Sequence, residues 1–309
     1  MATSIRSRFF PFIFLVLALT ADAQSPASNS LPKPFDPCVS VGLRKTVVCL
    51  GFRESSDDVK QAVTNELIGT GTLIAHPPLT YIVTARHVAE SLVRQETGKR
   101  HAAAFLNNKS GEAAYLDLSA ISQKHALTWI ASEKADLATF PFVRAADFDE
   151  LAVPDSLFLT SDSLTELQDV FLLSYQPELS DLVRIIPIAR RGMVSVINSD
   201  GSFYIDAFAF PGNSGSPAFT RPGPVSFAPG GIVFGGAACR FIGIVGEYLP
   251  YSEVAVSKQT GRPRVIFEEN TGLAKVWPVQ ALQVLFGDPL FLKQHERVLA
   301  MAGAGAKAP

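Results

Sequence analysis

Short apolar runs separated by turn-forming residues constrain the fold of this 309-residue chain more than any other feature. Each run has the length of a β-strand and is rich in Val, Ile, Phe and Thr. The runs are residues 46–52, 71–75, 81–85, 102–106, 137–143, 170–174, 184–189, 193–197, 203–206 and 241–246. This spacing predicts an all-β sandwich or barrel rather than alternating βαβ units. Helical patterns are few: one covers 87–95, and another covers 279–286 with Pro278 just before its first turn.

The composition is that of a globular protein, with 47% hydrophobic and 18% charged residues. The chain carries 27 basic and 29 acidic residues and no basic block, so nucleic acid is not an expected partner. Neither a Cys-x-x-Cys pair nor a Cys/His cluster occurs, so no metal site is predicted.

The N-terminus has the pattern of a secretory signal peptide. Arg6 and Arg8 precede the apolar run 9–19, and a small-residue site ending at Ala23 follows it. The run is shorter than the roughly 20 residues that a membrane span needs. We therefore expect a signal peptide over 1–23, cleavage after Ala23, and export to the periplasm or medium. An uncleaved membrane anchor is the alternative. A Ser-, Pro- and Asn-rich lead-in over 24–38 is expected to be disordered.

Three cysteines, Cys38, Cys49 and Cys239, leave at least one unpaired within a monomer. Cys38 and Cys49 are close enough in sequence to bridge a first hairpin. The alternative is that all three are small buried apolar residues.

Three segments carry the types of residue that nucleophilic acyl transfer requires. They are Thr84-Ala85-Arg86-His87-Val88, Ala135-Asp136-Leu137-Ala138, and Phe210-Pro211-Gly212-Asn213-Ser214-Gly215-Ser216-Pro217. A serine hydroxyl needs a base such as histidine, and the histidine needs a carboxylate on its other ring nitrogen. The oxyanion that forms needs preorganised backbone donors. Each segment alone is more often structural: a histidine at a strand end, a capping aspartate, or a Gly-Asn-Ser-Gly turn.

The order of the three segments excludes one class of hydrolase. In α/β-hydrolases the order is Ser, Asp, His, and the serine lies in a Gly-x-Ser-x-Gly turn. Here the order is His, Asp, Ser, and Ser216 stands where the second glycine of that turn is required.

Together the segments resemble those of the trypsin-like (chymotrypsin-fold) serine peptidases, and among these the bacterial Deg/HtrA type. The strand Gly69-Thr70-Gly71-Thr72-Leu73-Ile74 before the Thr-Ala-x-His element adds to this resemblance, which covers roughly residues 64–250. It implies two six-stranded antiparallel β-barrels, one over 39–150 and one over 151–287, with a short C-terminal helix and a tail over 288–309. The chain ends too soon after that helix for a PDZ domain of the usual form.

The resemblance also implies roles for individual residues. His87 corresponds to the general base, Asp136 to its orienting acid and Ser214 to the nucleophile, with the oxyanion hole at the backbone of Gly212 and Ser214. Asp117 is a rival for the acid but lacks the Asp-Leu-Ala context. Phe208, Val245 and Gly246 are expected at the substrate, where Phe208 would favour small or aliphatic side chains over Arg or Lys. The sequence does not fix the register of the strands near Asp206 and Glu247, so either carboxylate could change this preference.

Asn213 stands where animal digestive relatives carry an aspartate that pairs with a new N-terminus, so we expect no activation by N-terminal insertion.

The expected activity is exported endopeptidase cleavage of proteins or peptides through an acyl-enzyme, without a metal or organic cofactor. A catalytically silent, protein-binding homologue and an esterase on the same scaffold are the alternatives. The oligomeric state is not predicted.

Overall fold

The computed structural model describes residues 41–54, 64–176, 185–221, 225–228, 231–234 and 239–305. The expected signal peptide, the lead-in and Cys38 lie outside these residues. Residues Asp36–Pro309 cluster as one compact unit. In the described ranges, no helix is both long enough and apolar enough to span a bilayer.

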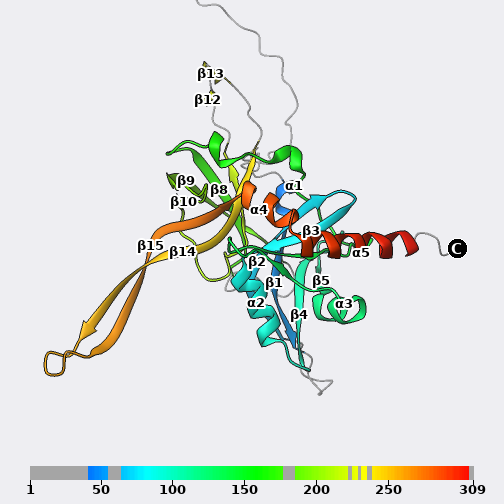
Figure 1. Cartoon of the computed structure of the whole chain (residues 1–309), viewed down its shortest axis with the longest axis horizontal. Helices are drawn as coiled ribbons and strands as arrows, with labels where there is room; N and C mark the ends of the chain where they lie inside the picture. The colour runs from blue at the N-terminus through cyan, green and yellow to red at the C-terminus, as the bar shows by residue number, and fades with distance from the viewer. Residues whose placement is uncertain are drawn as a thin grey trace, which may run out of the picture. The chain divides into compact units, whose positions relative to one another are not determined.

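The first part of the chain forms a seven-stranded antiparallel sheet (Figure 1), with the strand order β5-β4-β1-β2-β3-β7-β6. Its strands are β1 (Val47–Glu54), β2 (Thr64–His76), β3 (Leu79–Thr84), β4 (Arg100–Asn107), β5 (Ala113–Asp117), β6 (Ile130–Ala131) and β7 (Ala138–Pro141). The sheet has one strand more than the expected six, because the two-residue strand β6 pairs with β7.

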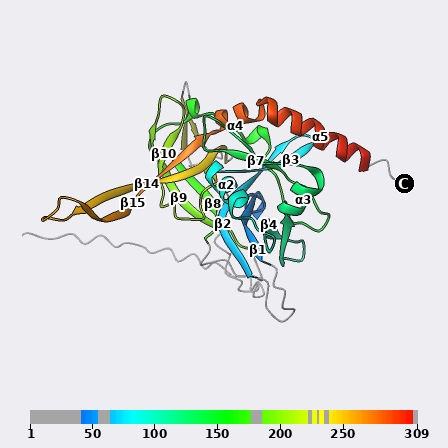
Figure 2. The same ribbon diagram turned by 60° about the horizontal axis from the view of Figure 1, so that its bottom comes forward.

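The second part forms a closed six-stranded barrel, as expected, with the strand order β10-β15-β14-β11-β8-β9. Its strands are β8 (Asp169–Ser174), β9 (Ile188–Ile197), β10 (Phe203–Asp206), β11 (Pro217–Thr220), β14 (Phe241–Val256) and β15 (Pro263–Pro278). A separate two-stranded hairpin, β12 (Val225–Ala228) with β13 (Gly231–Phe234), lies within residues 220–240, whose Gly and Pro content predicts a long loop instead. In Figures 1 and 2, β14 and β15 extend together beyond the barrel.

The buried core consists of three apolar clusters, one of which joins the two sheets. One fills the first sheet and includes Leu50, Leu73 and Phe140. Another fills the barrel and includes Phe203 and Ile205. The third is shared, because its buried residues come from both sheets and from the C-terminal helices; it includes Tyr81, Tyr175, Phe219, Leu282 and Phe291. Burial of this shared cluster fixes how the two sheets meet.

The helices are short except for the last. They are α1 (Val41–Arg44), α2 (Arg86–Gln95), α3 (Leu118–His125), α4 (Val279–Phe286) and α5 (Pro289–Gly305). Helix α2 and helix α4 lie where the sequence predicts them, and Pro278 is the N-cap of α4. Helix α5 occupies residues expected to be a tail, and its Phe291 is fully buried.

Side-chain hydrogen bonds dock α5 on the first sheet and its loops. The Gln294 side-chain amide accepts a hydrogen bond from the Thr128 backbone amide at 3.0 Å and donates one to the Thr128 carbonyl at 2.8 Å. The Tyr81 hydroxyl bonds Nδ1 of His295 at 2.7 Å. The rings of His76 and His295 lie 4.9 Å apart, centroid to centroid. Sequence spacing alone indicates no partner for either histidine.

Acid is expected to weaken the docking of α5. Burial lowers the pKa of both His76 and His295 from the ordinary 6.5, and charge on His295 further lowers the pKa of His76. The unfolded chain therefore binds more protons than the folded chain below about pH 6.5, and the free energy of unfolding falls as pH drops through that range. His87, whose pKa is raised, acts in the opposite direction over the same range.

The test is denaturant unfolding as a function of pH, compared between the protein and the double variant His76→Gln/His295→Gln. The variant is expected to lose less stability on acidification, because both histidines that resist protonation are gone. Equal slopes in the two proteins would contradict this account.

Candidate active site

His87 is the second residue of α2, which begins just after β3 ends at Thr84. Ala85 is the N-cap of the helix, and Val88, Ala89 and Leu92 bury one face of it. The buried face fixes the helix, and the His87 side chain on the other side stays 49% exposed. The histidine is therefore both held in place and open to a ligand.

Asp136 lies in the turn between β6 and β7. The Ser132 hydroxyl accepts a hydrogen bond from the Ala135 amide at 3.1 Å, and the Ser132 amide donates to the Leu137 carbonyl at 2.8 Å. Arg86 of α2 donates to the Ser132 carbonyl at 3.0 Å. These bonds fix the turn and tie it to the helix that carries His87.

Two hydrogen bonds join His87 to Asp136. Nδ1 of His87 lies 2.8 Å from Oδ2 of Asp136, and the His87 amide donates to Oδ1 at 3.1 Å. The rival Asp117 instead caps α3, where it accepts a hydrogen bond from the Ala120 amide at 2.8 Å. The structure therefore places Asp136, and not Asp117, on the histidine.

The pair shifts the pKa of both partners. The hydrogen bond that His87 donates to Asp136 has the largest effect on the pKa of His87; it outweighs burial, and the charges of Asp136, Glu247 and Glu90 add to it, so this pKa is raised. Burial alone would raise the pKa of Asp136, but hydrogen bonds and charge from His87 lower it below its ordinary value. Asp136 is thus ionised at neutral pH, and His87 is a stronger base than a free histidine.

Ser214 lies in a tight turn, the serine loop (residues 210–216), between β10 and β11. Two glycines with positive φ shape it: Gly212 at +96° and Gly215 at +89°. The amides of Asn213, Gly215 and Ser216 donate to backbone carbonyls. Within the described residues, the amides of Gly212 and Ser214 have no backbone acceptor. These are the two amides that the family resemblance assigns to an oxyanion hole.

Strand β2 of the first sheet holds the serine loop in place. The Thr70 amide donates to the Ser214 carbonyl at 2.9 Å, and the Thr70 hydroxyl donates to the Gly212 carbonyl at 2.8 Å. The Thr72 hydroxyl donates to the Gly215 carbonyl at 2.9 Å. The loop is therefore anchored to the sheet that carries His87, which fixes the serine relative to the histidine.

Asn213 is fully buried, and both ends of its side-chain amide are used. Its Oδ1 accepts a hydrogen bond from the Phe210 amide at 2.9 Å, and its Nδ2 donates to the Tyr175 carbonyl at 2.9 Å. The side chain therefore closes the loop through Phe210 and ties it to Tyr175, the residue after β8.

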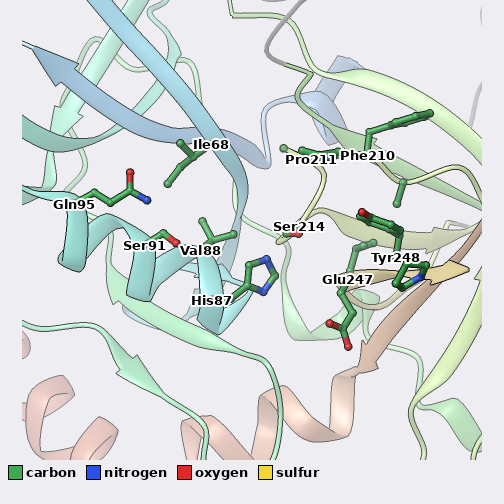
Figure 3. Close-up of a pocket in the computed structure, with 14 residues that line it drawn as sticks. Ile68, His87, Val88, Ser91, Gln95, Phe210, Pro211, Ser214, Glu247 and Tyr248 are labelled. Carbon is green, nitrogen blue, oxygen red and sulfur yellow. The ribbon is translucent and has the colours of Figure 1, made fainter. Parts of the chain in front are cut away.

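His87 and Ser214 line one cavity of about 460 Å³. Figure 3 shows the imidazole ring beside Ser214, with Glu247 and Tyr248 of β14 along one wall and Val88 and Ser91 of α2 along the other. Of the 14 lining residues, eight are apolar or glycine and six have polar side chains, so the cavity combines apolar surface with groups that can bind a polar substrate. Among the described residues, no group of His, Cys, Asp and Glu could hold a metal ion.

Comparison with known proteins identifies the family. The sequence model of the trypsin-like peptidase domain matches residues 69–225, about half of the chain. The chain belongs to the trypsin-like peptidase family. Its two antiparallel sheets and short helix α4 form the chymotrypsin-like fold expected from the sequence.

Two solved structures are similar to the chain. A crystal structure of Deg5 has 16% sequence identity and a TM-score of 0.43, covering 67% of this chain and 81% of that one. The HtrA-type protease AlgW, solved with a decapeptide, has 15% identity and a TM-score of 0.44, covering 79% of this chain and 63% of that one. A search of curated proteins finds no match.

The three expected substrate residues of this peptidase lie in different places. Val245 lines the cavity. Gly246 is buried beside it, where a Cβ would come within 2.9 Å of Nε1 of Trp277 and 3.3 Å of Oδ2 of Asp136. Phe208 is 57% exposed and is not among the lining residues; it stacks on Phe210, which is one.

Much of the cleft wall was not predicted from the sequence. Ile68, Ser91 and Gln95 line the α2 side, and Tyr248 and Pro250 line the β14 side. Glu247 and Tyr248 could have been predicted at the cleft, because they directly follow Val245 and Gly246 in the chain.

The fall of kcat/KM at acid pH is expected to depend on Glu247. Its charge raises the pKa of His87, and a general base must be deprotonated to act. In Glu247→Gln the pKa of His87 falls towards its ordinary value, so the variant keeps its activity to a lower pH. The measurement is kcat/KM against pH on one peptide substrate. Glu90→Gln serves as the control and is expected to shift this acid limb of the profile in the same direction but less. An unchanged or raised acid-limb pKa in Glu247→Gln would contradict the account.

Proposed function

We propose that this chain is an exported serine endopeptidase that cleaves protein or peptide bonds through a triad of Ser214, His87 and Asp136. One observation carries the proposal. Asp136 binds Nδ1 of His87, which leaves Nε2 for Ser214 in the same cavity. Membership of the peptidase family supports protein or peptide substrates.

In the first half of the reaction, Nε2 of His87 takes the hydroxyl proton of Ser214 while Oγ attacks the scissile carbonyl carbon. Asp136 holds the ring in the tautomer that leaves Nε2 unprotonated, and stabilises the imidazolium that forms. The carbonyl oxygen becomes an oxyanion and accepts hydrogen bonds from the amides of Gly212 and Ser214, which have no backbone acceptor among the described residues. His87 then donates its proton to the leaving amine, which gives the acyl-enzyme.

In the second half, His87 takes a proton from water, and the resulting hydroxide attacks the acyl carbon. Collapse of the second tetrahedral intermediate breaks the bond to Oγ and returns the proton to Ser214. No step needs a metal or an organic cofactor.

Turnover of an unfolded protein and of a matched peptide ester tests the proposal. We expect cleavage of both by the unchanged protein and of neither by Ser214→Ala or His87→Ala. Ester cleavage without amide cleavage would favour an esterase. A folded protein that cleaves neither but binds the unfolded chain would favour a silent, protein-binding homologue.

We also propose that activity does not depend on a newly cut N-terminus. Asn213 is satisfied by the Phe210 amide and the Tyr175 carbonyl, so the serine loop needs no ion pair from elsewhere. Removal of residues 24–40 from the signal-free protein is expected to leave kcat/KM within a few-fold of its starting value. A gain of orders of magnitude would contradict this proposal.

Export rests on the basic, apolar and small-residue pattern of residues 1–23. The mature protein is expected to begin at Gln24, which N-terminal sequencing of the protein from its producing cell would test. A mature chain that retains the apolar run 9–19 would point to a membrane anchor instead.

A further inference from the structure

The outer half of the long β14–β15 hairpin is a two-stranded ribbon without other strands. Its pairing runs from Tyr251 opposite Glu269 to Val256 opposite Pro263. In the described part of the chain, no third strand pairs with this distal hairpin (residues 251–269). An isolated two-stranded hairpin is only marginally stable in water. Figures 1 and 2 both show it extending away from the barrel.

The distal hairpin exposes large apolar side chains along β15. Val265 is 49% exposed, Ile266 62% and Phe267 56%. An exposed strand edge that carries such residues is a template for pairing with another strand. The outer edge of β15 pairs with β10 only from Leu273 onward, so in the described residues it has no strand partner over 263–269.

The sequence of this edge is complementary to itself. The segment reads Arg264-Val265-Ile266-Phe267-Glu268, with a basic residue two places before Ile266 and an acidic residue two places after it. Successive side chains of a strand point to opposite faces, so Arg264, Ile266 and Glu268 share one face. Two copies that run antiparallel about Ile266 would place each Arg264 opposite the other copy's Glu268.

The same register matches the second face. It places Val265 of each copy opposite Phe267 of the other, which is an aliphatic–aromatic pair of the kind that stabilises antiparallel strands. Ile266 then lies opposite itself on the first face. Every position from 264 to 268 thus meets a compatible partner in this one register, and a one-residue slip would misalign the charges.

We propose that two copies of this chain pair through the outer edges of β15, antiparallel and centred on Ile266, into a four-stranded sheet. The interface is isologous, so it closes as a dimer with two-fold symmetry. A lipid surface or an unrelated apolar peptide has no counterpart for the ordered charges of Arg264 and Glu268, whereas a second copy matches both.

The pairing can affect the cleft because β14 runs from the cleft wall directly into the distal hairpin. Glu247, Tyr248 and Pro250 line the cavity, and the distal hairpin begins at the next residue. Dimerisation would steady the ribbon whose base forms one cleft wall. The proposal does not depend on catalysis, since its test is the mass of the protein.

Sedimentation velocity of the purified protein over a wide concentration range tests the proposal. We expect a dimer that dissociates on dilution. Arg264→Glu and Glu268→Arg each place like charges opposite one another twice, and each is expected to weaken dimerisation by at least about tenfold. Ile266→Asp is expected to be monomeric. Because Ile266 is exposed, the body of this variant should stay folded, which circular dichroism checks.

Mixing the two charge variants gives the sharpest result. An Arg264→Glu chain and a Glu268→Arg chain have opposite charges at both contacts, so their mixture is expected to form a heterodimer at concentrations where each variant alone is mostly monomeric. Glu253→Arg is the matched control, since it makes the same charge change on β14, away from the pairing edge, and should remain dimeric.

Several results would overturn the proposal. They are a monomer at every concentration, a dimer that is not weakened in either single charge variant, and a mixture of the two variants that stays monomeric. A monomer that binds lipid vesicles or an extended peptide through Ile266 would assign the surface to that occupant and would equally overturn it.

Discussion

Asp136→Asn is expected to lower kcat by on the order of 10⁴-fold with little change in KM. In the structure, Oδ2 of Asp136 accepts the Nδ1 proton of His87. An asparagine amide in that position can donate to Nδ1 instead, which favours the tautomer with its proton on Nε2. Such a histidine cannot take the proton of Ser214. The measurement is steady-state kinetics on a peptide substrate, with circular dichroism to show that the fold is kept.

Asp117→Asn is the matched control for this prediction. Asp117 caps α3 through the Ala120 amide, and asparagine is also a good N-cap. We therefore expect near-normal kinetics and nearly unchanged stability. A severe loss of kcat in Asp117→Asn, or a loss below about tenfold in Asp136→Asn, would contradict the assignment of the acid.

Gly215→Ala is expected to disrupt the serine loop itself. Gly215 has φ of +89°, and a Cβ there would lie 1.9 Å from the Thr70 carbonyl oxygen and 2.2 Å from Oγ1 of Thr84. Neither atom can retreat easily, because Oγ1 of Thr84 donates to that same carbonyl at 2.7 Å. The loop must shift, and it takes the Ser214 amide and hydroxyl with it.

The expected loss in kcat/KM is on the order of 10²-fold or more, since misplacing one oxyanion donor alone has an effect of that size. Stability should fall as well, which thermal unfolding measures. Gly98→Ala is the control, because a Cβ added at Gly98 would meet no atom within 4 Å and the backbone there has no positive φ. Near-normal activity in Gly215→Ala would show that Thr70 and Thr84 do not position the serine.

The segments that meet at the cleft could be predicted from the sequence, because each contains residue types that catalysis or a tight turn requires. The Thr-Ala-x-His element ends a strand, and the glycines at 212 and 215 are required by positive φ. The fold class followed from the repeated short apolar runs. Strand β6 was missed because two residues carry no periodic pattern.

Other parts depend on tertiary context that a single sequence does not display. Only 241–246 of β14 was predicted as a strand, because the continuation is exposed on both faces and contains Pro250, so it lacks the alternation of a half-buried strand. The sequence of helix α5 predicts a tail because Ala and Gly dominate its end, whereas Phe291 and Gln294 show that its first turns are docked. The distance of Phe208 from Ser214 along the chain predicts a place at the substrate, but the sequence of a loop does not fix where a side chain points.

The most direct test of the central claim is labelling of the purified protein with a fluorophosphonate probe, followed by mass mapping of the adduct. The probe reacts only with a serine that a base has activated, so the account predicts one adduct at Ser214. Labelling should vanish in Ser214→Ala, in His87→Ala and after heat denaturation. A folded protein that remains unlabelled, or an adduct on another residue, would contradict it.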